Sequence, residues 1–268
     1  MKVLLKKVIS FLQSILGASG WSFEIVRTRP QKKWKTAYIP SIKVFMRLDL
    51  SESLDISYAS GSVDELNIAF MNSVLNNDSV FVDVGANQGF YSLFVLKAFP
   101  GAQVVAIEPD PYAVSKLQKN LELNNLQNSN IQIIQSAASL SDEFIELMIN
   151  DAGNRAGSSL VIDQRMYTGK VENTTVEVRG EPLFEILKRS NIQRVSCMKL
   201  DIEGYELPVL EKYFENAPLQ MWPNHLLVEA IGTSIKTVGG SPISLMFKQG
   251  YNLVNHDTYN YIFSNSRI

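Results

Sequence analysis

The sequence predicts an α/β fold built on a mostly parallel sheet. Short apolar runs of strand length alternate with longer segments of helical pattern, and turns rich in Gly, Pro and Asn separate them. This alternation is typical of βαβ units, whose buried parallel strands are apolar on both faces. Residues 61–268 contain no Gly/Ser/Pro-rich linker and no internal repeat, so we expect them to form one domain.

Residues 1–60 are expected to form a basic N-terminal extension with a helix and short strands. The 268-residue chain has a formal charge of −2, but residues 1–50 hold ten Lys or Arg against two acids, a net +8, which leaves −10 for the rest. Such asymmetry indicates an anionic partner. The single cysteine, Cys197, excludes a disulfide scaffold and lies in an apolar run, so we expect it in the core. Nothing indicates an oxidising compartment, and we expect a cytoplasmic protein.

The first residues of the chain allow three interpretations. Leu4, Val8, Phe11 and Ile15 recur at the spacing of an amphipathic helix. Such a helix could dock on the protein's own body, or residues 1–20 could make a peripheral contact with a membrane. Lysines ahead of an apolar stretch also resemble a signal peptide. The uncharged run would span about 24 Å as a helix, too short for a bilayer core of ~30 Å.

Two weaker signals precede the first strong strand. Residues 39–50 favour strands but are interrupted by Pro40. Ser62 and Glu65 have the spacing of a capping box, in which the serine accepts a backbone N–H and the glutamate reaches back to the N-cap. We therefore expect a helix from there to about Leu75.

The alternation of strands and helices is clearest after residue 80. The expected elements are strand 80–84, a helix to Phe99, strand 103–107, helix 110–124, strand 131–135, and strands 144–149 and 174–179 around a polar loop at 151–171. They continue as helix 181–190, strand 195–200, helix 207–214, strand 226–230, helix 242–249 and a hairpin of 251–254 with 259–263.

The first strong strand runs into a glycine loop, Asp83-Val84-Gly85-Ala86-Asn87-Gln88-Gly89. Gly85 and Gly89 allow a sharp turn and a close approach to a ligand, and the helix beyond offers free N–H donors. The spacing fits neither the dinucleotide fingerprint nor the P-loop. Asp83 would repel a pyrophosphate but suits an ammonium group, so the loop favours a zwitterionic ligand.

A second acid, Glu108, ends the next strand. Dinucleotide-binding folds place a carboxylate at this point to accept hydrogen bonds from ribose hydroxyls. A nucleoside that carries an amino-acid tail meets both demands, and S-adenosylmethionine is that molecule. The alternative is a glycine turn with two incidental acids.

Five segments together resemble one family of enzymes. They are Phe81–Ser92, Ala106–Pro109, Asn120–Asn124, Ser136–Ser139 and Met198–Glu206, the last of which reads MKLDIEGYE. The sequence is thereby similar to class I S-adenosylmethionine-dependent methyltransferases and, more narrowly, to the FkbM family. The resemblance covers about residues 62–231 and leaves the first 60 residues without a match.

The resemblance implies a seven-stranded Rossmann-like sheet whose last strand is antiparallel, and methyl transfer to a hydroxyl of a sugar, glycoconjugate or secondary metabolite. It implies S-adenosylmethionine as donor and S-adenosylhomocysteine as product. It places the methionine portion around Asp83, Gly85, Ala86, Asn87 and Gly89, the ribose at Glu108 and Pro109, and the adenine near Ser136 and Ala137.

Asp201 and Glu203 are the catalytic candidates. Asp201 ends a central strand, and Glu203 follows two residues later, before Gly204. A hydroxyl is a poor nucleophile, so a positioned carboxylate could act as its base. Asp201 could instead cap the next helix, with Glu203 on the surface. Two oxygen ligands are too few for a metal site, so none is predicted, although a divalent cation is conceivable.

Other residues and functions are weaker alternatives. His225 and His256 could each act as a base, and the loop 154–159 could cover an acceptor. A nicotinamide-dependent oxidoreductase or a non-catalytic methyltransferase-like adaptor are the rival functions. The acceptor is expected to be a small molecule or glycan and not a nucleic acid, because no recognition motif accompanies the basic charge. The oligomeric state is not predicted.

Overall fold

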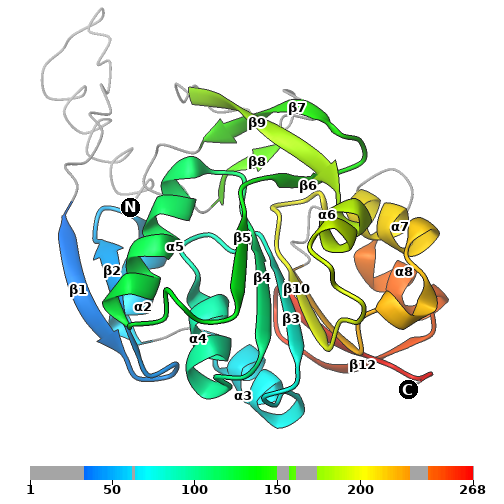
Figure 1. Cartoon of the computed structure of the whole chain (residues 1–268), viewed down its shortest axis with the longest axis horizontal. Coiled ribbons are helices and arrows are strands. Elements are labelled where there is room, and N and C mark those ends of the chain that lie inside the picture. Colours follow the sequence, from blue (N-terminus) through cyan, green and yellow to red (C-terminus); the bar gives the residue numbers. More distant parts are fainter. Residues whose placement is uncertain (1–32, 62–63, 150–156, 161–173, 230–240, 268) are drawn as a thin grey trace, which may run out of the picture.

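The computed structural model describes residues 33–61, 64–149, 157–160, 174–229 and 241–267. A seven-stranded sheet runs through its centre in the order β12-β13-β11-β10-β3-β4-β5 (Figure 1). Its strands are β3 (Val80–Val84), β4 (Gln103–Ile107), β5 (Ile131–Ile134), β10 (Cys197–Leu200), β11 (His225–Glu229), β12 (Tyr251–His256) and β13 (Asn260–Asn265). The last strand, β13, is antiparallel to β11 and to β12, whereas the neighbours from β11 to β5 are parallel. The predicted α/β class and antiparallel last strand are confirmed.

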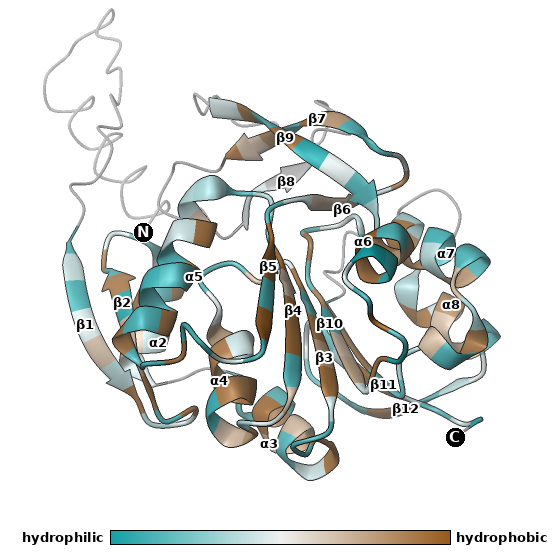
Figure 2. Ribbon diagram, in the orientation of Figure 1, coloured by the Kyte–Doolittle hydropathy of each residue, from teal (hydrophilic) through white to brown (hydrophobic). Residues whose placement is uncertain are grey.

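Alternate residues of the strands belong to two hydrophobic cores, one on each face of the sheet. In β3, Val82 and Val84 join one core, while Phe81 joins the other. Figure 2 shows the resulting hydrophobic strands in the middle of a more hydrophilic shell. Cys197 of β10 is fully buried, as predicted.

Helices cover both faces of the sheet. The first core packs against α6 (Leu183–Arg189), α7 (Glu206–Asn216) and α8 (Pro242–Lys248), and the second against α3 (Glu65–Val74), α4 (Phe90–Ala98) and α5 (Pro111–Leu123). A short 3₁₀ turn, η3 (Leu219–Met221), follows α7. These helices lie close to the predicted ranges, although Glu181 and Pro182 belong to the preceding strand.

The predicted strands around residues 144–179 form a separate sheet. Its order is β6-β9-β7-β8, from β6 (Ala137–Ser139), β7 (Glu143–Ile149), β8 (Ser159–Leu160) and β9 (Thr174–Pro182). In Figure 1 it lies beyond one end of the main strands. The sequence did not indicate β6, because Ala137-Ala138-Ser139 is too short and small to show a strand pattern, and β8 falls inside the segment predicted as a loop.

The N-terminal strands pack onto the main domain. An antiparallel hairpin of β1 (Trp34–Ile39) and β2 (Val44–Asp49) leads into α2 (Ser53–Ser60). Alternate residues of β2, namely Val44, Met46 and Leu48, are fully buried in the second core. The expected short strands are thus confirmed.

Two predictions for the N-terminal region fall wholly or partly outside the described residues. Residues 1–20 and Ser62 are among those not described. The predicted helix is present as α3, but its N-cap is Asp64, with a left-handed φ of 48° and no side-chain capping bond. Among the described helices, none is long and apolar enough to cross a membrane.

Candidate active site

A cavity of about 440 Å³ lies at the carboxyl ends of the central strands. Its walls include the ends of β3, β4, β10 and β11, which are neighbours in the sheet. The chain order reverses beside β3, since β4 lies on one side of it and β10 on the other. Ligands bind at such switch points in open α/β sheets.

The glycine loop is locked between two strand ends. Gly85 and Ala86 donate backbone hydrogen bonds to the carbonyl of Ile107, at 2.9 and 3.0 Å. Gly85 has a φ of 79°, and a Cβ there would lie 1.8 Å from the carbonyl oxygen of Asp201. Only glycine therefore fits at this position. Gly85, Ala86 and Asn87 line the cavity.

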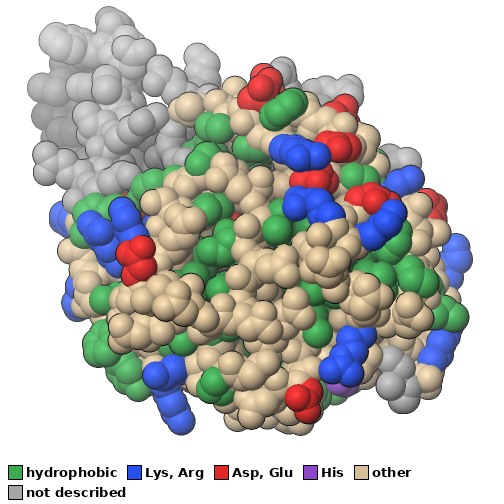
Figure 3. All heavy atoms as spheres, in the orientation of Figure 1, with side chains coloured by type: hydrophobic (Ala, Val, Ile, Leu, Met, Phe, Trp, Pro, Cys, Tyr) green, Lys and Arg blue, Asp and Glu red, His purple; other side chains and the backbone are tan. Residues whose placement is uncertain are grey.

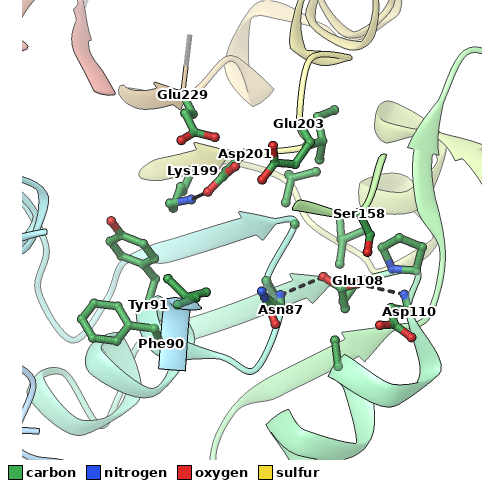
Figure 4. A pocket seen from close by; sticks show the side chains of 18 of the residues that line it. Asn87, Phe90, Tyr91, Glu108, Asp110, Ser158, Lys199, Asp201, Glu203 and Glu229 are labelled. Atoms are coloured by element: carbon green, nitrogen blue, oxygen red, sulfur yellow. Dashed lines mark hydrogen bonds and ion pairs between the residues drawn. The ribbon is translucent and has the colours of Figure 1, made fainter. Parts of the chain in front are cut away.

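Glu108 closes the other side of this loop. One carboxylate oxygen accepts the backbone N–H of Asn87 and the other that of Asp110, both at 2.8 Å (Figure 4). Burial raises the pKa of Glu108 to about 7, against the effect of these two bonds. Each oxygen keeps a lone pair for a hydroxyl donor. Pro109 beside it also lines the cavity.

Two residues of the predicted donor site do not line the cavity. Asp83 is buried and accepts hydrogen bonds from the backbone N–H and hydroxyl of Ser92, at 3.1 and 2.6 Å. Gly89 is the left-handed N-cap of α4, and its α-carbon faces Leu117. Both residues therefore shape the loop from behind. Ser136 and Ala137, by contrast, line the cavity.

Asp201 belongs to a polar cluster with Lys199, which is buried, and Glu229, which like Asp201 is half-buried. The Lys199 ammonium lies 2.6 Å from an Asp201 carboxylate oxygen and 4.8 Å from the ring centre of Tyr91. Burial raises the pKa of Asp201, but the charge of Lys199 and hydrogen bonds from Glu229 and Lys199 outweigh it, so the pKa lies below its usual range. Burial and the bond with Asp201 raise the pKa of Glu229. Glu229 therefore holds a proton more readily than an ordinary glutamic acid, and it is the donor in its hydrogen bond with Asp201.

Glu203 enters the cavity from a tight turn after β10. Its φ of 56° is left-handed, a strained conformation for a residue with a side chain. The turn is braced by Glu206, whose carboxylate accepts the backbone N–H groups of Ile202 and Gly204 at 3.0 and 3.1 Å. Burial, with the negative charges of Asp201 and Glu206, raises the pKa of Glu203 to about 7. Glu206, and not Asp201, thus organises the start of α7.

The carboxylates of Asp201, Glu203 and Glu229 converge. One oxygen of each lies within 4.8 Å of the others (Figure 4). Lys199 already neutralises Asp201, and the proton of Glu229 is shared with it. The negative charge of the cluster is thus offset by the Lys199 ammonium and by the proton that Glu229 shares with Asp201.

Several lining residues were not predicted. Asp55 and Tyr58 reach the cavity from α2, Asp64 from the start of α3, and Asn260 from β13. These elements are distant from the glycine loop in the sequence, so no local pattern indicates the contact. Glu229 is different: it ends an apolar strand, the same signal that indicated Glu108.

The histidine alternatives lie outside this cavity. His225 contacts the hydroxyl of Ser264 at 2.8 Å and the ring edge of Phe70. His256 stacks on Tyr261. Neither lines the cavity. Of the loop 154–159, residues 154–156 are outside the described part, whereas Ser158 is a lining residue.

Comparison with known proteins gives consistent matches. The model of the methyltransferase FkbM domain matches residues 83–251. Methyltransferase 1 of Beauveria bassiana is 32% identical over 146 residues, which cover 50% of this chain and 58% of that protein. Methyltransferase sdnD of Sordaria araneosa is 26% identical over 179 residues, 55% of this chain and 68% of that protein. The chain thus matches somewhat more than half of the first relative's length.

Solved structures show a more distant likeness. A crystal structure of an rRNA methylase from Streptococcus thermophilus aligns with a TM-score of 0.45 and 10% identity, over 75% of this chain and 95% of that one. The family match is the stronger finding. It extends from the glycine loop to the start of β12, which is more than half of the chain. The chain belongs to the FkbM methyltransferase domain family.

Proposed function

We propose that the protein is an S-adenosylmethionine-dependent methyltransferase that methylates a hydroxyl of a sugar, glycoconjugate or secondary metabolite. The observation that carries the proposal is a single cavity with two chemically different ends. Glu108, with Asn87 and Asp110, lies on one side, and Lys199, Asp201, Glu203 and Glu229 gather on the other (Figure 4). Family membership supports the reaction class.

The residues present fit such a donor. Glu108 offers free lone pairs to a ribose, with its carboxylate already fixed by two backbone N–H groups. Ser136 and Ala137 provide a small, buried wall for a base. The carboxylate of Glu203, when ionised, suits a donor that carries positive charge. When bound, this donor supplies a methyl group on a sulfonium that needs no further activation.

The chain's own contribution is to position and deprotonate the acceptor. Glu203, with its pKa near 7, accepts a proton from the acceptor hydroxyl. Lys199 holds Asp201 ionised and fixed, and Asp201 in turn holds Glu229. The acid–base role is thus assigned to Glu203 and the positioning role to its three neighbours.

Activity is expected to rise with pH up to about 7. Glu203 acts as a base only when ionised, so with a raised pKa of about 7 the value of kcat should fall about tenfold per unit below that pH and stay level above it. The measurement is kcat at saturating donor and acceptor from pH 5 to pH 9. A profile that is flat from pH 5 to 7 would remove Glu203 from the base role.

Glu108→Gln is expected to weaken donor binding by about 10- to 100-fold, the equivalent of one or two hydrogen bonds to a charged group. An amide offers one acceptor oxygen where the carboxylate offers two, and both are engaged in the loop. Calorimetry with S-adenosylhomocysteine measures the change. Glu122→Gln, an exposed change on α5, is the matched control and should leave the affinity unaltered.

The reaction itself is tested by transfer of a labelled methyl group. The purified chain is incubated with labelled S-adenosylmethionine and extracts of glycans, glycolipids and small metabolites, and products are identified by mass. A labelled methyl ether supports the proposal. Label on nitrogen or carbon alone would show a different acceptor chemistry, and absence of any labelled product would count against an enzyme.

A further inference from the structure

The proposed reaction does not use the basic charge of the N-terminal region. The structure describes part of that region, the β1–β2 hairpin, in which residues 33–50 contain four Lys or Arg and one acid. That acid, Asp49, is buried and binds the backbone N–H of Lys33 at 3.0 Å. All four basic residues are exposed, so this hairpin presents only positive charge to solvent.

Aromatic side chains lie among these charges. The antiparallel register pairs Tyr38 with Phe45 and Thr36 with Arg47, and Trp34 follows on the same face of β1. Trp34, Tyr38 and Phe45 are 40, 49 and 47% exposed. We call Trp34, Tyr38, Lys43, Phe45 and Arg47 the basic–aromatic face. Figure 3 shows Lys and Arg beside hydrophobic side chains at this edge of the molecule.

The scaffold holds this face rigidly. Asn124 of α5 accepts the backbone N–H of Phe45 at 2.8 Å and donates to its carbonyl at 2.7 Å, and Asn120 accepts the N–H of Arg47 at 2.8 Å. The edge of β2 is thereby covered by α5. The backbone of β2 is therefore held in place, while the side chains of Phe45 and Arg47 stay exposed.

We propose that the basic–aromatic face docks the protein on an anionic phospholipid surface. Aromatic rings at the headgroup level and basic side chains near anionic lipids are the two features that membrane-surface proteins combine. The 32 residues before the hairpin add six Lys or Arg against one acid, which strengthens the attraction. The face and the segment before it thus hold the positive half of the charge asymmetry.

The arrangement of the rings favours lipid over single-stranded nucleic acid. Base stacking needs a free ring face. The Tyr38 and Phe45 rings contact each other, with ring centres 5.2 Å apart. The guanidinium of Arg47 lies 4.6 Å from the ring centre of Trp34. Partial insertion at a headgroup layer needs only the exposed ring edges. The position is also informative, because Trp34 contacts Tyr112, a cavity-lining residue, with ring centres 6.5 Å apart.

The test is co-sedimentation of the full chain with vesicles. Phosphatidylcholine vesicles with about one third phosphatidylserine are compared with pure phosphatidylcholine vesicles. Lys43→Gln with Arg47→Gln is expected to weaken binding to the anionic vesicles about 25-fold, which is about fivefold for each charge. Tyr38→Thr with Phe45→Thr should weaken it on the order of tenfold.

The matched control removes the same charge elsewhere. Lys188→Gln with Lys248→Gln changes two exposed lysines on α6 and α8, across the sheet from the hairpin, and should leave binding unaltered. The proposal is overturned if the wild-type chain ignores anionic vesicles. It is equally overturned if both hairpin variants bind like the wild type, since the segment before residue 33 then carries the attraction. Binding to a poly-uridine oligomer in place of vesicles, lost in the variant with Lys43→Gln and Arg47→Gln, would assign the face to nucleic acid.

Discussion

Gly85→Ala is expected to abolish donor binding and to lower the melting temperature by about 10 °C, or about 3 kcal/mol of unfolding free energy. The added Cβ would lie 1.8 Å from the carbonyl oxygen of Asp201, which belongs to the backbone and cannot rotate away. Either the glycine loop or the end of β10 must move. Both segments contribute to the proposed site. The affinity for S-adenosylhomocysteine, measured by calorimetry, and the melting temperature should therefore fall together.

Gly61→Ala separates the clash from the backbone strain. Gly61 has a φ of 76°, nearly that of Gly85, but a Cβ there meets nothing within 4 Å. Its cost is the left-handed strain alone, about 1 kcal/mol or ~3 °C. Equal losses in the two variants would contradict the tight packing between Gly85 and Asp201.

Glu203→Gln is expected to reduce kcat by about 10²- to 10³-fold while donor affinity stays within about twofold, the signature of a lost general base. Glutamine has the same shape and keeps the turn that Glu206 braces. It cannot accept a proton, so the rise of kcat with pH should vanish as well. The measurements are kcat against pH and calorimetry on the same preparation.

Glu211→Gln is the control for this substitution. Glu211 is an exposed residue of the adjoining helix α7, and its loss of charge should leave kcat unaltered. A Glu203→Gln enzyme that retains more than about a third of the wild-type kcat would remove Glu203 from catalysis. The cluster around Asp201 would then act by orientation alone.

The titration of Glu108 must be separated from that of Glu203, because burial raises both pKa values to about 7. Protonated Glu108 has fewer acceptor sites, so below that pH donor affinity should fall. Protonated Glu203 affects the transfer step. Donor affinity and kcat measured at the same pH values therefore report on different carboxylates.

The sequence was most informative where a requirement is local. An apolar strand followed by glycine, and an acid at the end of the next strand, led to Gly85 and Glu108, and the structure brings both to one cavity. It was misleading for Asp83. A strand-end acid looks like a ligand group, but here Asp83 does not line the cavity, and one of its carboxylate oxygens accepts both hydrogen bonds from Ser92 on the following helix turn.

Contacts between distant segments could not be predicted. Asp55 and Tyr58 belong to a region without family resemblance, yet they line the cavity. Asp55 is buried and pairs with Lys116 of α5 at 2.7 Å, 61 residues away in the chain. Such an ion pair follows from the packing of α2 on α5 and has no periodic signature. The division at residue 61 therefore stays a prediction about sequence only, because α2 contributes to the site.

The most direct test of the central claim is calorimetry of the wild-type chain with S-adenosylhomocysteine, alongside NAD(H). The account predicts saturable 1:1 binding of S-adenosylhomocysteine that Glu108→Gln weakens, and no binding of NAD(H). Binding of NAD(H) in its place, or no binding of S-adenosylhomocysteine to folded protein, would contradict the proposal that this cavity holds a methyl donor.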